Sequence, residues 1–227
     1  AVFGDFGIEY FLDLPKPMAQ HPVVELIEAA LSVVCEGFSS SDVFAYLKTG
    51  LAGIDQTQVD ILENYCLAFG IDRHLWTAAK PWSFAGKKSY YDEKVINDLR
   101  GKVIRPLEKL KDAIKPDKKI TPRAFTAAIY DLLDRLDVFG TVSKWTESAD
   151  ESERLEQSQF FDKLASTFDE LNDIFGDEPM QIEDIATLIN NAFSRLSLKL
   201  IPQKLDQVLV GSIDRSRHPE LKAVFLI

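Results

Sequence analysis

Apolar residues recur at helical spacing through most of this 227-residue chain, and this pattern limits the fold more than any other feature of the sequence. Glycine, proline and small capping residues interrupt the pattern and divide it into segments of ordinary helix length. Pro106 falls inside one long segment and predicts a kink or a break there. We predict helices around residues 22–36, 40–47, 55–69, 91–114, 121–136, 154–175 and 182–196.

The two ends of the chain have a different pattern, in which apolar residues follow one another without a helical period. Continuous runs of this kind are typical of strands buried on both faces of a parallel sheet. They occur at residues 8–12, 208–210 and 224–227. The predicted fold class is mostly α: a bundle-like helical insertion with a small parallel sheet formed by N- and C-terminal strands. Because an open buried strand is a poor end for a domain, we expect the chain to be a piece of a larger protein.

Charge is distributed unevenly along the chain, which has a formal net charge of −10. Residues 87–123 contain 12 basic and 6 acidic side chains, whereas residues 146–184 contain 2 basic and 13 acidic ones. The overall acidity argues against strong nucleic-acid binding by the chain as a whole, since phosphate neutralisation needs clustered Lys and Arg. The basic stretch suits a phosphate backbone or an acidic partner subunit, and salt bridges within the chain are the alternative.

The sequence has no motif of a catalytic centre: it lacks a phosphate-binding G-x-x-x-x-G-K-[ST] loop, a G-x-G-x-x-G and a G-x-S-x-G. Its three histidines, His21, His74 and His218, stand too far apart to predict a metal site. Cys35 and Cys66 lie in apolar helical patterns and are expected to be buried thiols. We therefore expect no catalytic residue, no metal and no cofactor within this chain.

Aromatic residues gather beside the basic stretch. Such rings can stack bases in proteins that bind single-stranded nucleic acid. Packing in the core or anchoring of a loop is the alternative, and it is the one that we favour. The residues are Trp76, Trp82, Phe84, Tyr90 and Tyr91.

No apolar stretch approaches the roughly 20 residues that a membrane span needs. The first residues have no basic region and no cleavage-site pattern of a signal peptide. We therefore expect a cytoplasmic protein without a membrane partner.

Several blocks of sequence carry a resemblance to a known family. The first are G-I-E-Y-F-L-D at residues 7–13 and K-P-M-A-Q-H-P-V-V-E-L at residues 16–26. Others are Y-L-K-T-G-L at residues 46–51, E-N-Y-C-L-A-F-G-I at 63–71, and G-S-I-D-R-S-R followed by A-V-F-L near the end. Together they resemble AddB-type subunits, the second subunits of bacterial ATP-dependent helicase/nuclease complexes. The resemblance is clear over about the first 80 and the last 20 residues and thin between them.

The resemblance implies a helicase-type fold of the UvrD/Rep kind, in which a helical insertion called 2B interrupts a RecA-like domain. It implies an N-terminal strand stub at residues 1–20, the insertion at 21–202 and returning strands at 203–227. Residues 212–220 take the place of a T-I-H-K-A-K-G-L-E motor motif. Asp214 stands where the motif has His, and His218-Pro219 stands where it has Gly-Leu. Ser212, Asp214, Arg217 and His218 therefore mark a degenerate motor motif.

The resemblance also implies a function: a helicase-like subunit, inactive in this part, that acts in double-strand-break repair and recombination in the bacterial cytoplasm. The whole complex would use ATP, Mg²⁺ and an iron–sulfur cluster, and would contain an AddA-type helicase/nuclease subunit and double- and single-stranded DNA. Neither the nuclease motifs nor the cluster cysteines of the family match this chain. Cys35 and Cys66 are not expected to be cluster ligands.

Two other interpretations stay open at this point: an unrelated helical interaction domain, and an enzyme whose site is too dispersed to recognise. For any nucleic-acid contact, we predict basic residues of the 87–123 stretch and of the degenerate motif. These candidates are Lys87, Lys88, Arg100, Lys102, Arg105, Arg215 and Arg217.

Overall fold

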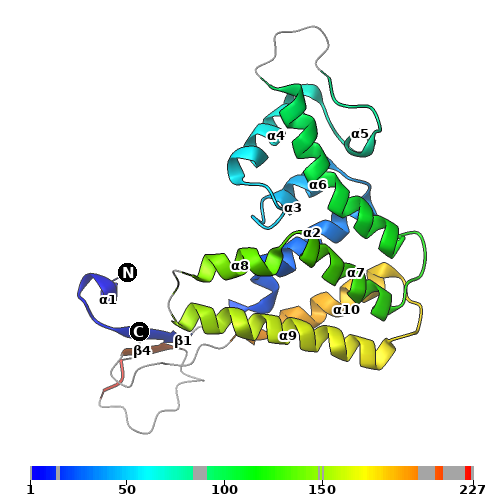
Figure 1. Ribbon diagram of the computed structural model, residues 1–227. Coiled ribbons are helices and arrows are strands. Elements are labelled where there is room, and N and C mark those ends of the chain that lie inside the picture. The colour runs from blue at the N-terminus through cyan, green and yellow to red at the C-terminus, as the bar shows by residue number, and fades with distance from the viewer. Residues whose placement is uncertain are drawn as a thin grey trace.

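Helices make up most of the structure, as the sequence predicts. The computed structural model describes residues 2–13, 16–83, 91–147, 149, 151–198, 208–211 and 223–225. The helices are α1 (Val2–Asp5), α2 (Pro22–Glu36), α3 (Ser40–Leu47), α4 (Gln56–Phe69), α5 (His74–Thr77), α6 (Glu93–Ile114), α7 (Pro122–Arg135), α8 (Val138–Thr146), α9 (Glu151–Phe175) and α10 (Ile182–Arg195), with a 3₁₀ turn, η1 (Met18–Gln20). Figure 1 shows α3 to α6 on one side of α2 and α7 to α10 on the other.

Two pairs of short strands lie where the chain enters and leaves the helical body. β1 (Tyr10–Asp13) runs parallel to β4 (Val208–Gly211), with Tyr10 opposite Val208. β2 (Lys16–Pro17) pairs antiparallel with β3 (Ser197–Leu198). Figure 1 shows β1 and β4 side by side at one corner, beyond the helices. Residues 224 and 225, the described part of the third predicted strand segment at 224–227, are not in a strand. That these strands belong to a larger RecA-like sheet, and that the domain boundaries lie at 20 and 202, stay predictions.

The helix starts follow the local signals in the sequence. The Nδ1 atom of His21 accepts a hydrogen bond from the Val23 N–H at 3.2 Å, so His21 is the N-cap of α2, with Pro22 as its first residue. Asp55 and Gln58 form a reciprocal capping box at the start of α4. At the end of α2, Gly37 adopts φ of 83°, which closes the helix in the left-handed conformation. In each case, residues next to the helix end in the sequence set the boundary.

The structure also contains helices that the sequence patterns did not predict. α8 follows α7 almost directly, because Asp137 takes a left-handed conformation with φ of 49° and turns the chain there. α5 is a single turn inside a segment that reads as a loop. Pro106 does not split the long helix, since α6 is continuous from Glu93 to Ile114. Packing of its buried face outweighs the one backbone hydrogen bond that proline removes.

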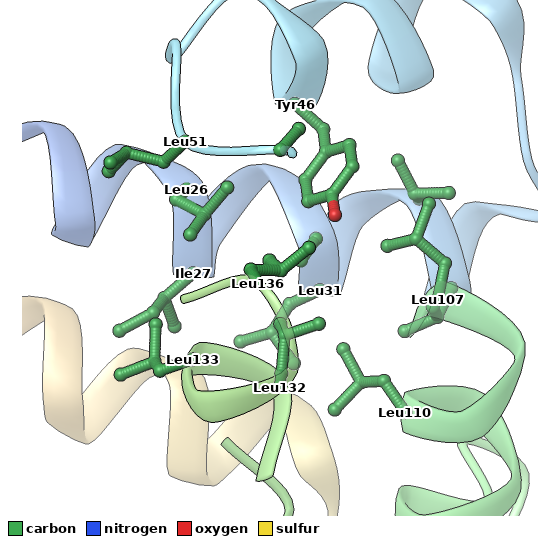
Figure 2. Packing of buried hydrophobic residues seen from close by; sticks show 14 of the residues in the cluster. Leu26, Ile27, Leu31, Tyr46, Leu51, Leu107, Leu110, Leu132, Leu133 and Leu136 are labelled. Carbon is green, nitrogen blue, oxygen red and sulfur yellow. The ribbon is translucent and has the colours of Figure 1, made fainter. Parts of the chain in front are cut away.

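One continuous hydrophobic core joins the first half of the chain to the second. Figure 2 shows leucines of α2, α6 and α7 meeting around the ring of Tyr46 from α3. Each large apolar side chain buried in this way contributes about 1.5–3 kcal/mol. Core residues in this view are Leu26, Ile27, Leu31, Tyr46, Leu51, Leu107, Leu110, Leu132, Leu133 and Leu136.

Two helical hairpins, α6–α7 and α9–α10, are joined at their tips. Ile120 and Met180 exchange two backbone hydrogen bonds of 2.9 Å, which form an isolated antiparallel bridge between the two connecting loops. Beside it, the Arg123 Nε atom lies 3.3 Å from the Asp177 carboxylate. Both side chains of this ion pair are mostly exposed, so it adds little stability, and the backbone bridge with buried Ile120 fixes the two tips.

The hydroxyl of Tyr46 is the one buried side-chain polar atom without a hydrogen-bond partner among the described residues. Tyr46 is fully buried, and burial raises the pKa of its phenol well above the ordinary value. We expect Tyr46→Phe to leave the fold intact and to increase the free energy of unfolding by up to about 1 kcal/mol, since it removes an unsatisfied polar group without leaving a cavity. Urea unfolding followed by far-UV circular dichroism measures this. Tyr46→Ala, which removes the whole ring, should instead lose about 3–5 kcal/mol; a clear loss with Phe would show that the hydroxyl has a partner.

Candidate nucleic-acid interface

The solvent-facing side of α6 carries a stripe of basic residues. Lys102, Arg105 and Lys109 are all exposed or half-buried at the surface, and at 100° per residue they lie within about 60° of one another around the helix axis. The opposite side of α6 is buried in the core through Leu99, Val103, Leu107 and other residues. The three cations therefore face away from the protein and extend over about 10 Å of helix.

The basic stripe has acidic neighbours on the helix but forms no ion pair with them. None of the three side chains forms an ion pair with another described residue. The guanidinium of Arg105 folds back along the helix over Gly101 and lies 3.6–3.7 Å from the position that a Cβ atom would take there, an ordinary van der Waals distance. Asp98 and Asp112, both exposed, lie on the same face one turn beyond the two ends of the stripe, and the half-buried Glu108 lies one turn after Arg105. Its centre is therefore a local concentration of positive charge on an acidic chain.

Arg100, one of the candidates from the sequence, does not belong to this surface. It is 9% exposed, and its guanidinium donates hydrogen bonds to the carbonyls of Trp76 at 2.8 Å, Lys80 at 3.1 Å and Ala78. The guanidinium carbon also lies 4.8 Å from the centre of the Trp82 ring. Burial lowers the pKa of Arg100 from its ordinary value, with Glu108 opposing the shift. Arg100 therefore fixes the segment after α5 and is not available to a nucleic acid.

The aromatic cluster is part of the core. Trp76 is fully buried and Trp82 is 6% exposed; their rings contact edge to face with centroids 5.2 Å apart. Trp82 stacks on Tyr65 at 5.3 Å, and Tyr65 in turn meets Tyr91 edge to face at 5.5 Å. The expectation of packing is confirmed for Trp76 and Trp82, which are buried, and Tyr91 packs half-buried against the same cluster. Phe84 and Tyr90 lie outside the described residues.

The remaining candidates from the sequence lie outside the residues that the structure describes, and their roles stay predictions. Two belong to the segment before α6, and the others to the degenerate motor motif after β4. They are Lys87, Lys88, Ser212, Asp214, Arg215, Arg217 and His218.

Two hollows in the helical body were candidates for a small-molecule site. One, of about 480 Å³, lies between α2 and α3 and is lined by Glu25, Glu28 and Asp42 among others. Burial and the neighbouring Glu25 raise the pKa of Glu28. The other, of about 520 Å³ between α3 and α4, has a mixed lining of apolar residues such as Phe44 and Leu67 and polar ones such as Lys48 and Glu63. Both are open grooves, and neither brings together a nucleophile, a base and an orienting partner.

Within the described parts of the chain, no three His, Cys, Asp or Glu side chains gather closely enough to hold a metal ion. The two cysteines are free thiols; Cys66 is buried as expected, whereas Cys35 is only half-buried. Burial raises the pKa of Cys35 to about 11 and that of Cys66 to about 12. They come from different helices, α2 and α4. None of the helices among the described residues has the length and apolar character needed to cross a membrane.

The fold and surface together define a mostly helical body that the chain enters and leaves between paired strands, with a basic stripe on its longest central helix. No family model matches the chain. Curated proteins, in contrast, match the chain along its whole length. The chain is 36% identical over 249 residues to the B subunit of the ATP-dependent helicase/deoxyribonuclease of Desulforudis audaxviator, covering 100% of this chain and 21% of that protein. It is 34% identical to the Moorella thermoacetica protein of the same name, covering 99% and 20%.

A third relative, the corresponding B subunit of Acetivibrio thermocellus, is 36% identical and again matches 100% of this chain and 21% of its own length. The chain thus belongs to the family of these helicase/deoxyribonuclease B subunits and spans about one fifth of the length of the curated relatives that it matches. The resemblance to AddB-type subunits that its motifs carry is confirmed. It extends also through the middle of the chain, where the motifs are thin.

Proposed function

We propose that this chain is the non-catalytic, 2B-like helical insertion of a helicase/deoxyribonuclease B subunit, and that it serves the architecture of the subunit and its handling of DNA. The observation that carries the proposal is the match to B subunits over the whole chain. The basic stripe on α6 supports the part that concerns DNA, since exposed Lys and Arg in a row are what a phosphate backbone requires.

The strands support the placement as an insertion. β1 and β4 are neighbours although nearly the whole chain lies between them, and the Met18 N–H donates to the Leu196 carbonyl at 3.0 Å at the entrance of the helical body. This is the connectivity expected when a helical body interrupts a sheet-containing domain. In this proposal the sheet is of the RecA type, and residues 212–220 are its decayed motor motif.

The wider role follows from the relatives' name and from the motif resemblance. We place the whole protein in the bacterial cytoplasm, in a complex with an AddA-type helicase/nuclease subunit that processes DNA ends in double-strand-break repair and recombination. ATP, Mg²⁺ and an iron–sulfur cluster would be bound elsewhere in that complex. Cys35 and Cys66, on separate helices, do not provide a cluster site.

The chain enters and leaves the helical body at neighbouring points, which suggests a direct test. Replacing residues 19–195 of the full-length protein by a short Gly-Ser turn should preserve the β2–β3 pair. We expect the shortened protein to retain catalytic activities on short substrates and to lose DNA affinity by about tenfold or more. The isolated chain should hydrolyse neither ATP nor DNA above background. Turnover by the isolated chain, or unchanged DNA binding by the shortened protein, would overturn the proposal.

A further inference from the structure

We infer that the basic stripe of α6, formed by Lys102, Arg105 and Lys109, binds the sugar–phosphate backbone of duplex DNA without reading its sequence. The inference rests on the proposed function and names the form of DNA that this surface takes. It concerns a surface of the described residues alone and needs no contact from the degenerate motor motif.

The geometry of the stripe fits a phosphate backbone. α6 has 22 residues, so it forms a rod of about 33 Å, and its buried face fixes the rod against α2 and α7. Rigid helices carrying cations at successive turns can follow a row of phosphates, and such contacts fix position and carry no sequence information directly. Lys102, Arg105 and Lys109 occupy successive turns of this exposed face.

The absence of aromatic residues separates duplex from single-stranded DNA. Proteins that hold single strands combine a basic groove with rings on which bases stack. α6 contains no Phe, Tyr, Trp or His, and Trp76 and Trp82 are buried in the core. The stripe thus offers charge without a stacking platform, which suits a backbone whose bases are already paired.

An acidic face elsewhere in the body supports an oriented contact. Asp162, Asp169 and Asp173 lie at the surface of α9 and fall within about 40° of one another around its axis. Its charge is opposite to that of the stripe, so phosphate is attracted to α6 and repelled by this face of α9. Like-charge repulsion of this kind discourages misdirected binding and gives the surface a preferred side.

The test is charge reversal in the full-length protein in its assembled complex. The α6 variant is the triple substitution Lys102→Glu/Arg105→Glu/Lys109→Glu. Its control is the triple substitution Lys144→Glu/Arg154→Glu/Arg195→Glu, which changes the net charge by the same amount at surface residues of α8, α9 and α10. Fluorescence anisotropy measures the affinity for a blunt 30-base-pair duplex and for a 30-nucleotide oligo-dT (probe lengths of about three helical turns) over a range of KCl concentrations. Each triple variant is also made in the isolated 227-residue chain, and circular dichroism checks that it folds.

The α6 variant should bind the duplex about tenfold or more weakly, and the slope of log K against log salt should fall by about 2–3, since each lost phosphate contact removes about 0.9. Oligo-dT affinity and the α8–α10 variant should change little. If the Glu variant misfolds, the Gln triple variant at the same positions replaces it and should give the same direction.

Other outcomes overturn the inference in distinguishable ways. Equal loss of duplex and oligo-dT would show a general strand-binding surface. Unchanged DNA binding with loss of the co-purifying subunit would show that the stripe meets an acidic protein partner. Both would leave the proposed function standing. Failure of the unaltered complex to bind any DNA would instead reject the proposed function itself.

Discussion

Arg100→Ala is expected to destabilise the fold by about 3–5 kcal/mol, the largest effect that we predict for a single polar side chain here. The substitution leaves the buried carbonyl of Trp76 and the partly buried carbonyls of Ala78 and Lys80 without their donor. Hydrogen bonds from a charged group contribute about 1.5–3 kcal/mol each, with incomplete additivity. It also removes the guanidinium from the face of Trp82. Urea unfolding of the purified chain measures the loss.

Arg105→Ala is the matched control, because it removes the same side chain from the exposed face of the same helix. Its effect should stay within about 0.5 kcal/mol. Arg100→Lys should lie between the two, since an ammonium cannot reach three carbonyls in the fork geometry of a guanidinium. Equal stability of the Arg100 and Arg105 variants would contradict the structural role that we assign to Arg100.

Arg100 also shows what sequence reasoning could and could not reach. Counting charge over residues 87–123 correctly marks a basic segment, but it does not say which cations point inward. Helical phase holds that information: Arg100 lies on the same side of α6 as Leu99, Val103 and Leu107. Its carbonyl partners could not be found in this way, because they come from an irregular segment around α5 whose path depends on tertiary packing.

The predicted helices share an apolar period, and some of them also have a terminator that acts locally. Gly37 and Gly70 close α2 and α4 in left-handed conformations. α8 was missed because Asp137, not glycine or proline, turns the chain there; a left-handed aspartate is uncommon and carries no strong signal. The parallel pairing of β1 with β4 joins residues far apart in sequence, where local patterns specify a strand but not its partner.

His21→Ala is expected to cost about 3 kcal/mol of unfolding free energy, because this one side chain joins the start of α2 to α9. Its Nδ1 atom caps α2, its Nε2 atom lies 2.9 Å from the Gln157 Oε1 atom, and its ring stacks on Phe160 with centroids 3.4 Å apart. Since Nδ1 accepts the Val23 N–H, the ring donates from Nε2 to Gln157. A lost cap costs about 1 kcal/mol, a lost buried hydrogen bond a similar amount, and a lost ring contact about 0.5–1.5 kcal/mol. In a chain of this size the thermal midpoint should fall by about 6–12 °C.

His21→Asn separates the cap from the ring contacts. Asparagine is a good N-cap, so it should recover about 1 kcal/mol of the loss while leaving Phe160 without its stacking partner. Gln157→Ala should remove only the bond to α9 and cost about 1 kcal/mol. If His21→Asn were as stable as the unaltered chain, the ring would contribute nothing beyond the cap, and the attachment of α2 to α9 would depend on the surrounding core alone. If it were no better than His21→Ala, the cap would be unimportant and the interhelical contacts would account for the whole effect.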